Sequence, residues 1–369
     1  MTTTTPVSPN EAVLTEALAG LTAHPQKTLP PWLFYDQRGS ALFEQITTLP
    51  EYYLTRTERA LFAAHSADIL RQFLTPGAPS GLPLLAPDPF TIAELGAGTA
   101  SKTGLLLHAA TLLQPELLYQ PIDVSPTALT TAADTLTAAL PGLTVHPQLA
   151  NYITEPYTLT HTQETGAGAP GPDSRTWDSP DARATPGSSG RPIPARRSRI
   201  LALYIGSSIG NFTPDEATII LRRLRTHLQP GDALLLGTDL APSRQKRLST
   251  ILAAYNDAAG VTAAFNLNIL TRLNRELDAD FRLSAFAHRV RWNAAESRIE
   301  MHLESLVPQT VHIAGHRIHF DQGDTIHTEN SYKFTDAALE AQLARSGFTP
   351  TCTFHDSTRS FALTLAHTL

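Results

Sequence analysis

The chain lacks the features that mark secreted, disulfide-stapled or membrane-spanning proteins. Its 369 residues include one cysteine, Cys352, so no disulfide framework can form, and a reducing compartment is expected. The first ten residues carry no basic segment followed by an apolar one, as a signal peptide would. No run approaches the roughly 18 consecutive apolar residues of a membrane span. We therefore expect a cytoplasmic protein with no membrane partner.

An excess of positive charge is also missing. The chain has 28 Lys and Arg against 34 Asp and Glu, which gives a formal net charge of -6. No basic stripe interleaved with aromatic residues occurs, so nucleic acid is not expected as a partner. With 42% hydrophobic residues, the chain can bury one large core or two joined lobes. This composition is typical of a soluble globular protein.

A glycine turn between a strand and a helix is the strongest local signal. Residues 89–93 form a buried strand pattern that ends at Glu94, and a helical pattern resumes over residues 102–110. Between them, Gly96 and Gly98 allow a tight turn and a close approach of the backbone to a ligand. Strand, turn and helix together predict a nucleotide site in a doubly wound sheet.

The residues around this turn favour one nucleotide over another. A dinucleotide fingerprint needs a third glycine, and Ser101 stands in its place, which weakens an NAD-dependent oxidoreductase. Glu94 before the first glycine resembles motif I of S-adenosylmethionine (SAM)-dependent methyltransferases. Asp123 follows at the end of a second strand, where a carboxylate can accept both ribose hydroxyls, and Ser125 can cap the next helix. Read alone, these residues could also be ordinary turn residues; together they predict a SAM site.

The order of elements predicts the fold class. Strands and helices alternate over residues 89–155, the sheet resumes at 200–205, and strand patterns at 352–354 and 360–365 would close it. We expect an α/β class I SAM-dependent methyltransferase fold, with a Rossmann-like seven-stranded sheet and a C-terminal antiparallel hairpin. Residues 157–198, rich in Gly, Pro, Ser and Asp, are predicted to be a disordered insert.

A second, smaller α+β domain is expected to bind the substrate. Two helical patterns (244–258 and 262–277) precede three alternating strands, expected at 286–292, 299–306 and 311–320. The expected division is residues 1–56 and 242–332 for the substrate domain, and 57–241 and 333–369 for the methyltransferase domain.

Candidate acceptor residues lie outside the nucleotide half. Asn211 closes a Gly-rich segment that begins at Gly206, and it can donate to a carboxylate or accept from an ammonium, unless it merely caps a turn. Glu329 and Ser331 share one face of an extended strand, so they could grip a ring with one N–H and one acceptor nitrogen. Ordinary strand surface is the alternative.

A group of aromatic residues and a group of histidines each allow two interpretations. Tyr35, Phe43, Tyr52 and Tyr53 could be core, or could form an aromatic wall around a methylated cation. The sequence spacing of His312, His316, His319 and His327 fits no zinc pattern, so no metal is expected.

Several long segments together resemble one family, the histidine-specific Nα-methyltransferases that make hercynine, the betaine precursor of ergothioneine. The resemblance covers nearly the whole chain except 157–198. The segments that carry it are residues 29–36 (LPPWLFYD), 39–40 (GS), 49–53 (LPEYY), 55–58 (TRTE), 254–266 (AYNDAAGVTAAFN) and 274–277 (NREL).

The resemblance implies roles for particular residues. Gly96, Lys102 and Asp123 would contact SAM, and Asn151-Tyr152 would contact its adenine, although the family has a carboxylate where Asn151 stands. For the substrate, the residues implied to hold or line the histidine are Tyr52, Asn211, Tyr255, Met301, Glu329 and Ser331, and we add Gly206 and Asn330 from the same segments.

The resemblance also implies the reaction: three successive in-line transfers of methyl from SAM to the α-amino nitrogen of L-histidine. Tyr35 and Tyr52 are the expected catalytic residues, and with unperturbed pKa values near 10 they should orient the amine rather than act as bases. The alternatives are an N-methyltransferase for another amino acid, such as a tryptophan derivative, and a non-catalytic SAM-binding regulator. We expect a monomer.

Overall fold

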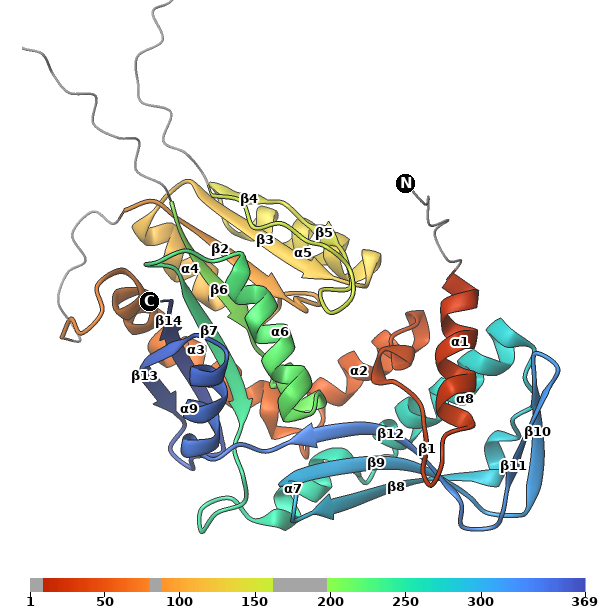
Figure 1. The fold of residues 1–369 in the computed structure, drawn as a ribbon. Helices are drawn as coiled ribbons and strands as arrows, with labels where there is room; N and C mark the ends of the chain where they lie inside the picture. The colour runs from red at the N-terminus through yellow and green to blue at the C-terminus, as the bar shows by residue number, and fades with distance from the viewer. Residues whose placement is uncertain (1–8, 80–87, 162–197, 369) are drawn as a thin grey trace, which may run out of the picture.

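The computed structural model describes residues 9–79, 88–161 and 198–368. They form two lobes, one around a large mixed sheet and one around a small sheet, joined by several crossings of the chain (Figure 1).

The large sheet has the strand order expected of a class I methyltransferase. The order is β13-β14-β7-β6-β2-β3-β4, and the short β5 also pairs with β3. The strands are parallel except that β14 is antiparallel to β7 and β13 to β14. The bounds are β2 (Phe90–Leu95), β3 (Leu117–Asp123), β4 (Leu143–Val145), β5 (Gln148–Leu149), β6 (Arg199–Tyr204), β7 (Ala233–Asp239), β13 (Thr349–His355) and β14 (Phe361–His367). The order reverses between β2 and β6, where open α/β sheets bind ligands at the carboxyl ends of the strands.

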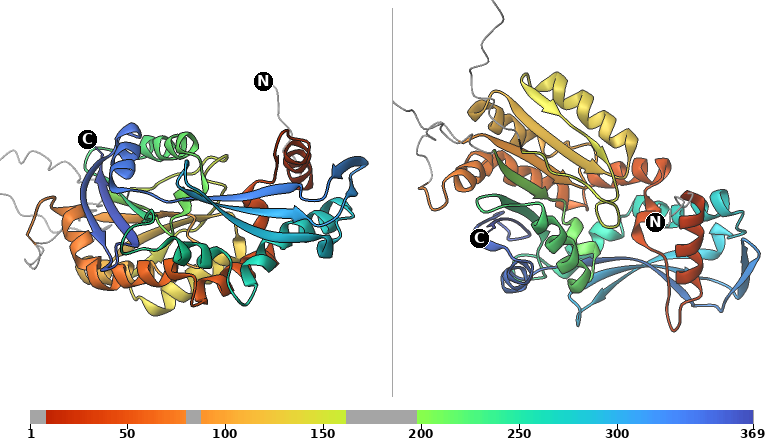
Figure 2. Two further views of the ribbon diagram at one scale, coloured as in Figure 1. Left: turned by 90° about the horizontal axis from the view of Figure 1, so that it is seen from below. Right: turned by 45° about the horizontal axis from the view of Figure 1, so that its top comes forward.

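Helices cover both faces of this sheet, because apolar side chains of β6 point to both sides and each side must be buried. Leu201 and Leu203 point into a core shared with three of the helices, whereas Ile200, Ala202 and Tyr204 point into a second core. The first core involves α3 (Tyr53–Leu74), α4 (Gly104–Leu113) and α5 (Pro126–Ala139); the second involves α6 (Pro214–Thr226) and α9 (Asp336–Arg345). Figure 2 shows α3 and α6 on opposite sides of the sheet.

The small sheet has the order β1-β12-β9-β8 and is antiparallel except for the β1–β12 pair. Its strands are β1 (Lys27–Thr28), β8 (Phe286–Asn293), β9 (Arg298–Ser305) and β12 (Thr325–Tyr332). The same lobe contains α1 (Pro9–Leu21), α2 (Gln37–Thr48), α7 (Leu248–Tyr255) and α8 (Val261–Leu277), and the 3₁₀ turns η1 (Pro31–Phe34) and η3 (Leu283–Ala285). β12 leads back to α9 in the large lobe (Figure 1).

Some expected elements differ from those observed. The single strand expected at 311–320 is a separate hairpin, β10 (Gln309–Ile313) and β11 (His316–Phe320), which turns at Ala314 and Gly315, both with positive φ. The helix expected at 244–258 is shorter, because Ser243 Oγ accepts hydrogen bonds from the backbone N–H groups of Gln245 and Lys246 and holds them in a turn.

The division into domains remains a proposal, and its boundary at 56/57 falls within α3. Most of the insert expected at 157–198 lies outside the described residues. Its described ends are packed against the fold: Tyr157 is 4% exposed and Ser198 is fully buried. In the described part of the chain, no helix combines the length and apolar character needed to cross a membrane.

Candidate active site

The glycine turn after β2 is tied to the end of β3 by one carboxylate. Gly96 and Gly98 have φ values of 66° and 53°, a conformation that glycine adopts without strain. Asp123 accepts a hydrogen bond from Gly98 N at 2.8 Å through one oxygen and from Ser125 N at 2.9 Å through the other. Asp123 therefore lies directly beside the glycine turn, and its role in binding SAM stays a prediction.

Glu94 braces the turn from inside the fold. Its side chain is 2% exposed and accepts hydrogen bonds from Thr103 Oγ1 at 2.8 Å and from the Tyr119 hydroxyl. Burial raises the pKa of Glu94 to about 7, although both hydrogen bonds oppose the rise. Glu94 thus joins β2, β3 and the start of α4.

Glu58 is a residue of this site that the sequence reasoning missed. The side chain of Glu58, on α3, is fully buried, and its carboxylate accepts from Lys102 Nζ at 2.6 Å and from Gly206 N at 2.8 Å. A Cβ on Gly237 would lie 2.3 Å from Glu58 Oε1, so this close approach requires glycine. The sequence contained one sign of its importance, because Glu58 ends the segment 55–58 that carries part of the family resemblance.

Asn151 and Tyr152 lie beyond the end of β5. Asn151 Oδ1 accepts a hydrogen bond from Ile153 N at 3.0 Å, so the amide already shapes a local turn. The ring of Tyr152 would be 3.5 Å from a Cβ on Gly96, which places it over the glycine turn. Burial raises the pKa of Tyr152 to about 12, so its hydroxyl keeps its proton at neutral pH.

Two adjoining cavities lie at the carboxyl ends of these strands. One is lined by the glycine turn and by Glu58 and Lys102. The other is lined by residues of both lobes. They share Phe43, Tyr52, Leu54, Gly206 and Ser208, so a group in one can reach a group in the other.

The second cavity brings together residues that are far apart in the sequence. Predicted residues that line it are Tyr35, Tyr52, Gly206, Asn211, Tyr255, Met301, Glu329 and Ser331. Asn211 ends the 3₁₀ turn η2 (Ser208–Asn211), just after β6. Asn330 is not among the lining residues. Of the four aromatic residues considered together, Tyr53 is elsewhere, and its hydroxyl donates to Asp239 at 2.8 Å.

A β-bulge in β12 explains why Glu329 lines the cavity and Asn330 does not. The register between β12 and β9 shifts between His327 and Glu329, so that Glu329 pairs with Met301 and Asn330 with Glu300. Met301 lines the cavity, and because neighbouring residues of a strand face opposite ways, Glu300 and Asn330 face away from it.

A buried network holds the hydroxyl groups of Tyr255 and Ser331. Lys333 Nζ donates to Tyr255 OH and to Ser331 Oγ, each at 2.8 Å, and the two hydroxyls lie 2.7 Å apart. The third partner of Lys333 is Asp239 Oδ2 at 2.8 Å, and Asp239 also pairs with Lys246 at 2.5 Å. Burial alone would raise the pKa of Asp239, but the two lysines outweigh it and lower the pKa.

The titratable groups in the cavity are shifted by burial. Burial raises the pKa of Glu329 to about 7, with Lys333 opposing the rise. Burial also raises the pKa values of Tyr35 and Tyr52 well above their ordinary range. Both phenols therefore stay protonated at neutral pH, which suits orientation and not proton removal.

Comparison with known proteins decides among the functions that this geometry allows. Residues 13–368 match a family model described as "Histidine-specific methyltransferase, SAM-dependent". The chain belongs to this family. It is therefore a SAM-dependent methyltransferase, and the alternatives of an NAD-dependent oxidoreductase and a non-catalytic regulator are set aside.

Two curated relatives match this chain over nearly its whole length, and a third matches two thirds of it. It is 38% identical over 360 residues to a histidine N-alpha-methyltransferase of Mycolicibacterium smegmatis, covering 96% of this chain and 95% of that one. It is 35% identical over 357 residues to the histidine N-alpha-methyltransferase of Mycobacterium tuberculosis, covering 96% and 94%. Ergothioneine biosynthesis protein 1 of Schizosaccharomyces pombe is 30% identical over 247 residues, which cover 67% of this chain and 26% of that one.

Of the residues predicted to contact SAM, Gly96 and Lys102 line the first cavity, whereas Asp123, Asn151 and Tyr152 are not among its lining residues. Asp123 and Tyr152 lie beside its glycine turn, and the residues at and around this turn fit SAM. Glycines at positive φ leave the backbone open to a ligand, and Asp123 is fixed by two backbone N–H groups with further acceptor capacity on both oxygens. Tyr152 offers an aromatic face beside the turn.

Proposed function

We propose that this methyltransferase acts on L-histidine and transfers three methyl groups to its α-amino nitrogen, which gives hercynine. The observation that carries the proposal is the cavity-facing pair Glu329 and Ser331, which the alternation of β12 places on one face after the bulge. The curated relatives named for histidine methylation support the same acceptor.

The network behind the cavity suits a neutral imidazole. An ammonium group can only donate, so Lys333 makes Tyr255 OH and Ser331 Oγ both act as acceptors. One of the two hydroxyls donates its proton to the other. The second hydroxyl keeps its own proton free to donate into the cavity. The site therefore offers one donor there and one acceptor, the carboxylate of Glu329. A neutral imidazole has one acceptor nitrogen and one N–H, which match this pair.

The other end of the cavity suits an amino acid head group. Asn211 can donate to the carboxylate of the substrate, and Gly206 lies where the two cavities meet. Tyr52 and Tyr35 line the same region as Phe43, with ring centroids of Phe43 6.4 Å from Tyr52 and 5.8 Å from Tyr35. These aromatic faces would accept the cationic dimethylated intermediate and its trimethylated product.

SAM, when bound, supplies the methyl group; Gly96, Lys102, Asp123, Asn151 and Tyr152 are the residues proposed to hold it. The chain's own contribution is positioning, because a well-oriented pair of reactants can gain up to about 7–11 kcal/mol over free ones. Tyr35 and Tyr52, both protonated, would direct the lone pair of the amine toward the shared opening of the cavities.

The direct test is to incubate the purified full chain with SAM and each amino acid in turn, and to follow masses by chromatography and mass spectrometry. We expect histidine to gain one, two and finally three methyl groups, with the trimethylated species accumulating. Methylation of a tryptophan derivative but not of histidine would reassign the acceptor. A histidine reaction that stops at one methyl group would refute the hercynine product.

A further inference from the structure

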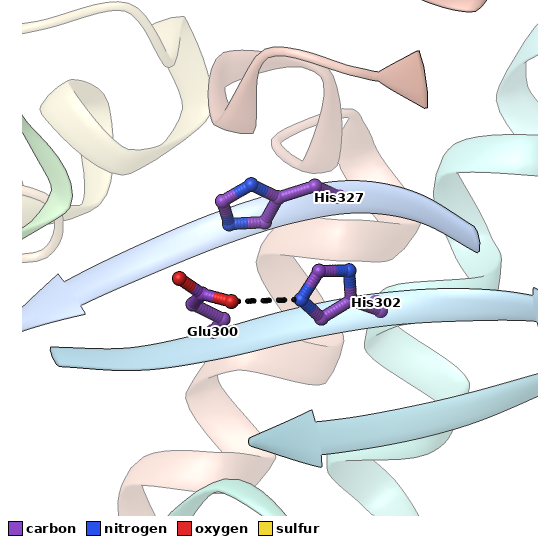
Figure 3. Close-up of side chains that lie close together, drawn as sticks. All are labelled: Glu300, His302 and His327. Carbon is purple, nitrogen blue, oxygen red and sulfur yellow. Dashed lines mark hydrogen bonds and ion pairs between the residues drawn. The ribbon is translucent and has the colours of Figure 1, made fainter. Parts of the chain in front are cut away.

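Three potential metal ligands gather on the face of the small sheet that points away from the second cavity, which is the proposed substrate cavity. Glu300 and His302 are two residues apart on β9, and His327 on β12 is the direct cross-strand partner of His302. Figure 3 shows the three side chains close together on this face, with the contact between Glu300 and His302 dashed. Their candidate ligand atoms all lie within 4.8 Å of one another.

We propose that Glu300, His302 and His327 form a binding site for a divalent transition-metal ion of the zinc type. Two imidazole nitrogens and one carboxylate oxygen are ligands that Zn²⁺ and its neighbours in the first transition row accept, whereas Mg²⁺ and Ca²⁺ prefer oxygen alone. Such a site is separate from the methyltransferase cavity and does not depend on the proposed substrate. The sequence expectation of no metal considered four histidines close in the chain, and only His327 belongs to this cluster.

Two buried polar atoms at the cluster have no hydrogen-bond partner. His302 is 2% exposed, and its Nδ1 has no hydrogen-bond partner. Asn330, opposite Glu300 in the register, has a buried Oδ1 that also lacks a hydrogen-bond partner. Asn330 Oδ1 is therefore available as a further oxygen ligand. The nitrogen that His302 turns toward Glu300 is Nε2, at 3.2 Å, and His327 Nε2 contacts the backbone oxygen of Glu329 at 3.1 Å, a contact that an ion would have to replace.

Further contacts orient the carboxylate as a ligand. Glu300 Oε1 accepts from Asn293 Nδ2 at 2.9 Å and from Arg298 Nε at 2.8 Å, while Oε2 faces His302 Nε2 at 3.2 Å. This division leaves one oxygen for an ion and holds the other, as outer partners do in known metal sites.

Two features set the expected strength of the site. The imidazole rings are stacked, with centroids 4.7 Å apart and planes 20° apart, so one ring must rotate for both nitrogens to meet an ion. Ligand atoms bound tetrahedrally at about 2.0–2.1 Å lie roughly 3.3 Å apart, which a small closure achieves. Arg298, paired with Glu300, and Arg291, across from it on β8, add positive charge that weakens cation binding. The site should therefore bind more weakly than a cysteine-rich structural zinc site.

The test uses untagged full-length protein freed of metal with a chelator. Zn²⁺ is titrated by calorimetry, Co²⁺ by visible absorption, and the unfolding temperature is measured with and without Zn²⁺. We expect one equivalent to bind, a ligand-field spectrum with Co²⁺, and a higher unfolding temperature, because the ion would join β9 to β12. Absence of binding at millimolar Zn²⁺ would overturn the proposal.

Variants locate the ion. The double substitution H302Q/H327Q should weaken Zn²⁺ binding by at least about 100-fold, since loss of even an outer partner costs about 10- to 100-fold. The matched control is H312Q/H319Q, which removes two exposed histidines of the β10–β11 hairpin that each lie beside an aspartate. The proposal fails if the control, and not the cluster variant, loses binding.

A measurement on the unaltered protein guards against variants that do not fold. Crystals soaked in Zn²⁺ should give an anomalous scattering peak between Glu300, His302 and His327. A peak found only at other positions would refute the site.

Discussion

Substitution of Glu329 tests the candidate site most directly. In the described part of the chain, Glu329 is the only charged residue that lines the substrate cavity. Glu329→Ala would leave a ring N–H of bound histidine without an acceptor. A hydrogen bond to a charged group contributes about 1.5–3 kcal/mol, which is about 10- to 150-fold, and a site left with an unpaired buried group can discriminate by about 10⁴.

Because no second carboxylate is available in the cavity, we expect Glu329→Ala to lower kcat/KM for histidine by at least about 10³-fold, towards that upper value. Glu329→Gln keeps a carbonyl acceptor at the same place and should lose only about 10-fold, or about 1.4 kcal/mol. SAM affinity should change less than about twofold in both variants, since Glu329 does not line the cofactor cavity.

The assay measures initial rates at saturating SAM with histidine varied, and SAM binding by calorimetry. A Glu329→Ala enzyme that methylates histidine within tenfold of the wild-type rate would refute the assigned cavity. Equal losses in the Ala and Gln variants would refute the hydrogen-bond argument, because Gln retains the acceptor.

Other contacts in the two cavities give further predictions. Since the folded-state pKa of Glu329 is raised from 4.5 to about 7, kcat/KM for histidine should fall as pH drops through 7, and Glu329→Gln should flatten that limb of the rate profile. The folded state holds this proton more tightly than the unfolded state. As the pH rises from 5 to 8, the wild type should therefore lose stability relative to Glu329→Gln, by no more than about 3 kcal/mol in urea titrations. Lys333→Met leaves Asp239 with one lysine and removes the donor to Tyr255 and Ser331; it should destabilise the fold by about 3 kcal/mol in urea titrations and raise KM for histidine in steady-state assays. Gly237→Ala places a Cβ 2.3 Å from Glu58 Oε1, so the Glu58–Lys102 pair must move, and SAM binding measured by calorimetry should weaken by about 10-fold or more.

The cofactor half could be predicted from the sequence because its signals are local. A buried strand, two glycines that adopt positive φ and a helix follow one another within about twenty residues, and Asp123 ends the next strand. In a parallel sheet, the ends of neighbouring strands meet at one edge, so sequence order alone places these residues together. The strand order of the large sheet confirmed that expectation.

Residues whose roles depend on distant partners could not be found in this way. Glu58 lies in the middle of a helix, and only the fold brings it to Lys102 and Gly206. Lys333 follows the predicted Glu329–Ser331 pair by two residues, but its burial is possible only because it pairs with Asp239 at the end of β7. A charged side chain normally indicates a solvated surface, so the residue type argued against burial at both positions, although Glu58 shares the helix face of Leu54 and Leu61.

The bulge in β12 shows why a correct prediction about one face was still incomplete. Alternation places His327, Glu329 and Ser331 on the same face of a regular strand. The extra residue, Thr328, reverses that parity: Glu329 and Ser331 stay together on the cavity side, whereas His327 moves to the other side, next to His302. Thr328 is fixed there, because its hydroxyl donates to Asn266 Oδ1 at 2.7 Å. Without this irregularity, an imidazole of the protein would occupy the same side as the groups proposed to read the imidazole of the substrate. One inserted residue therefore keeps the cavity free for its substrate and, at the same time, assembles the candidate metal ligands behind it.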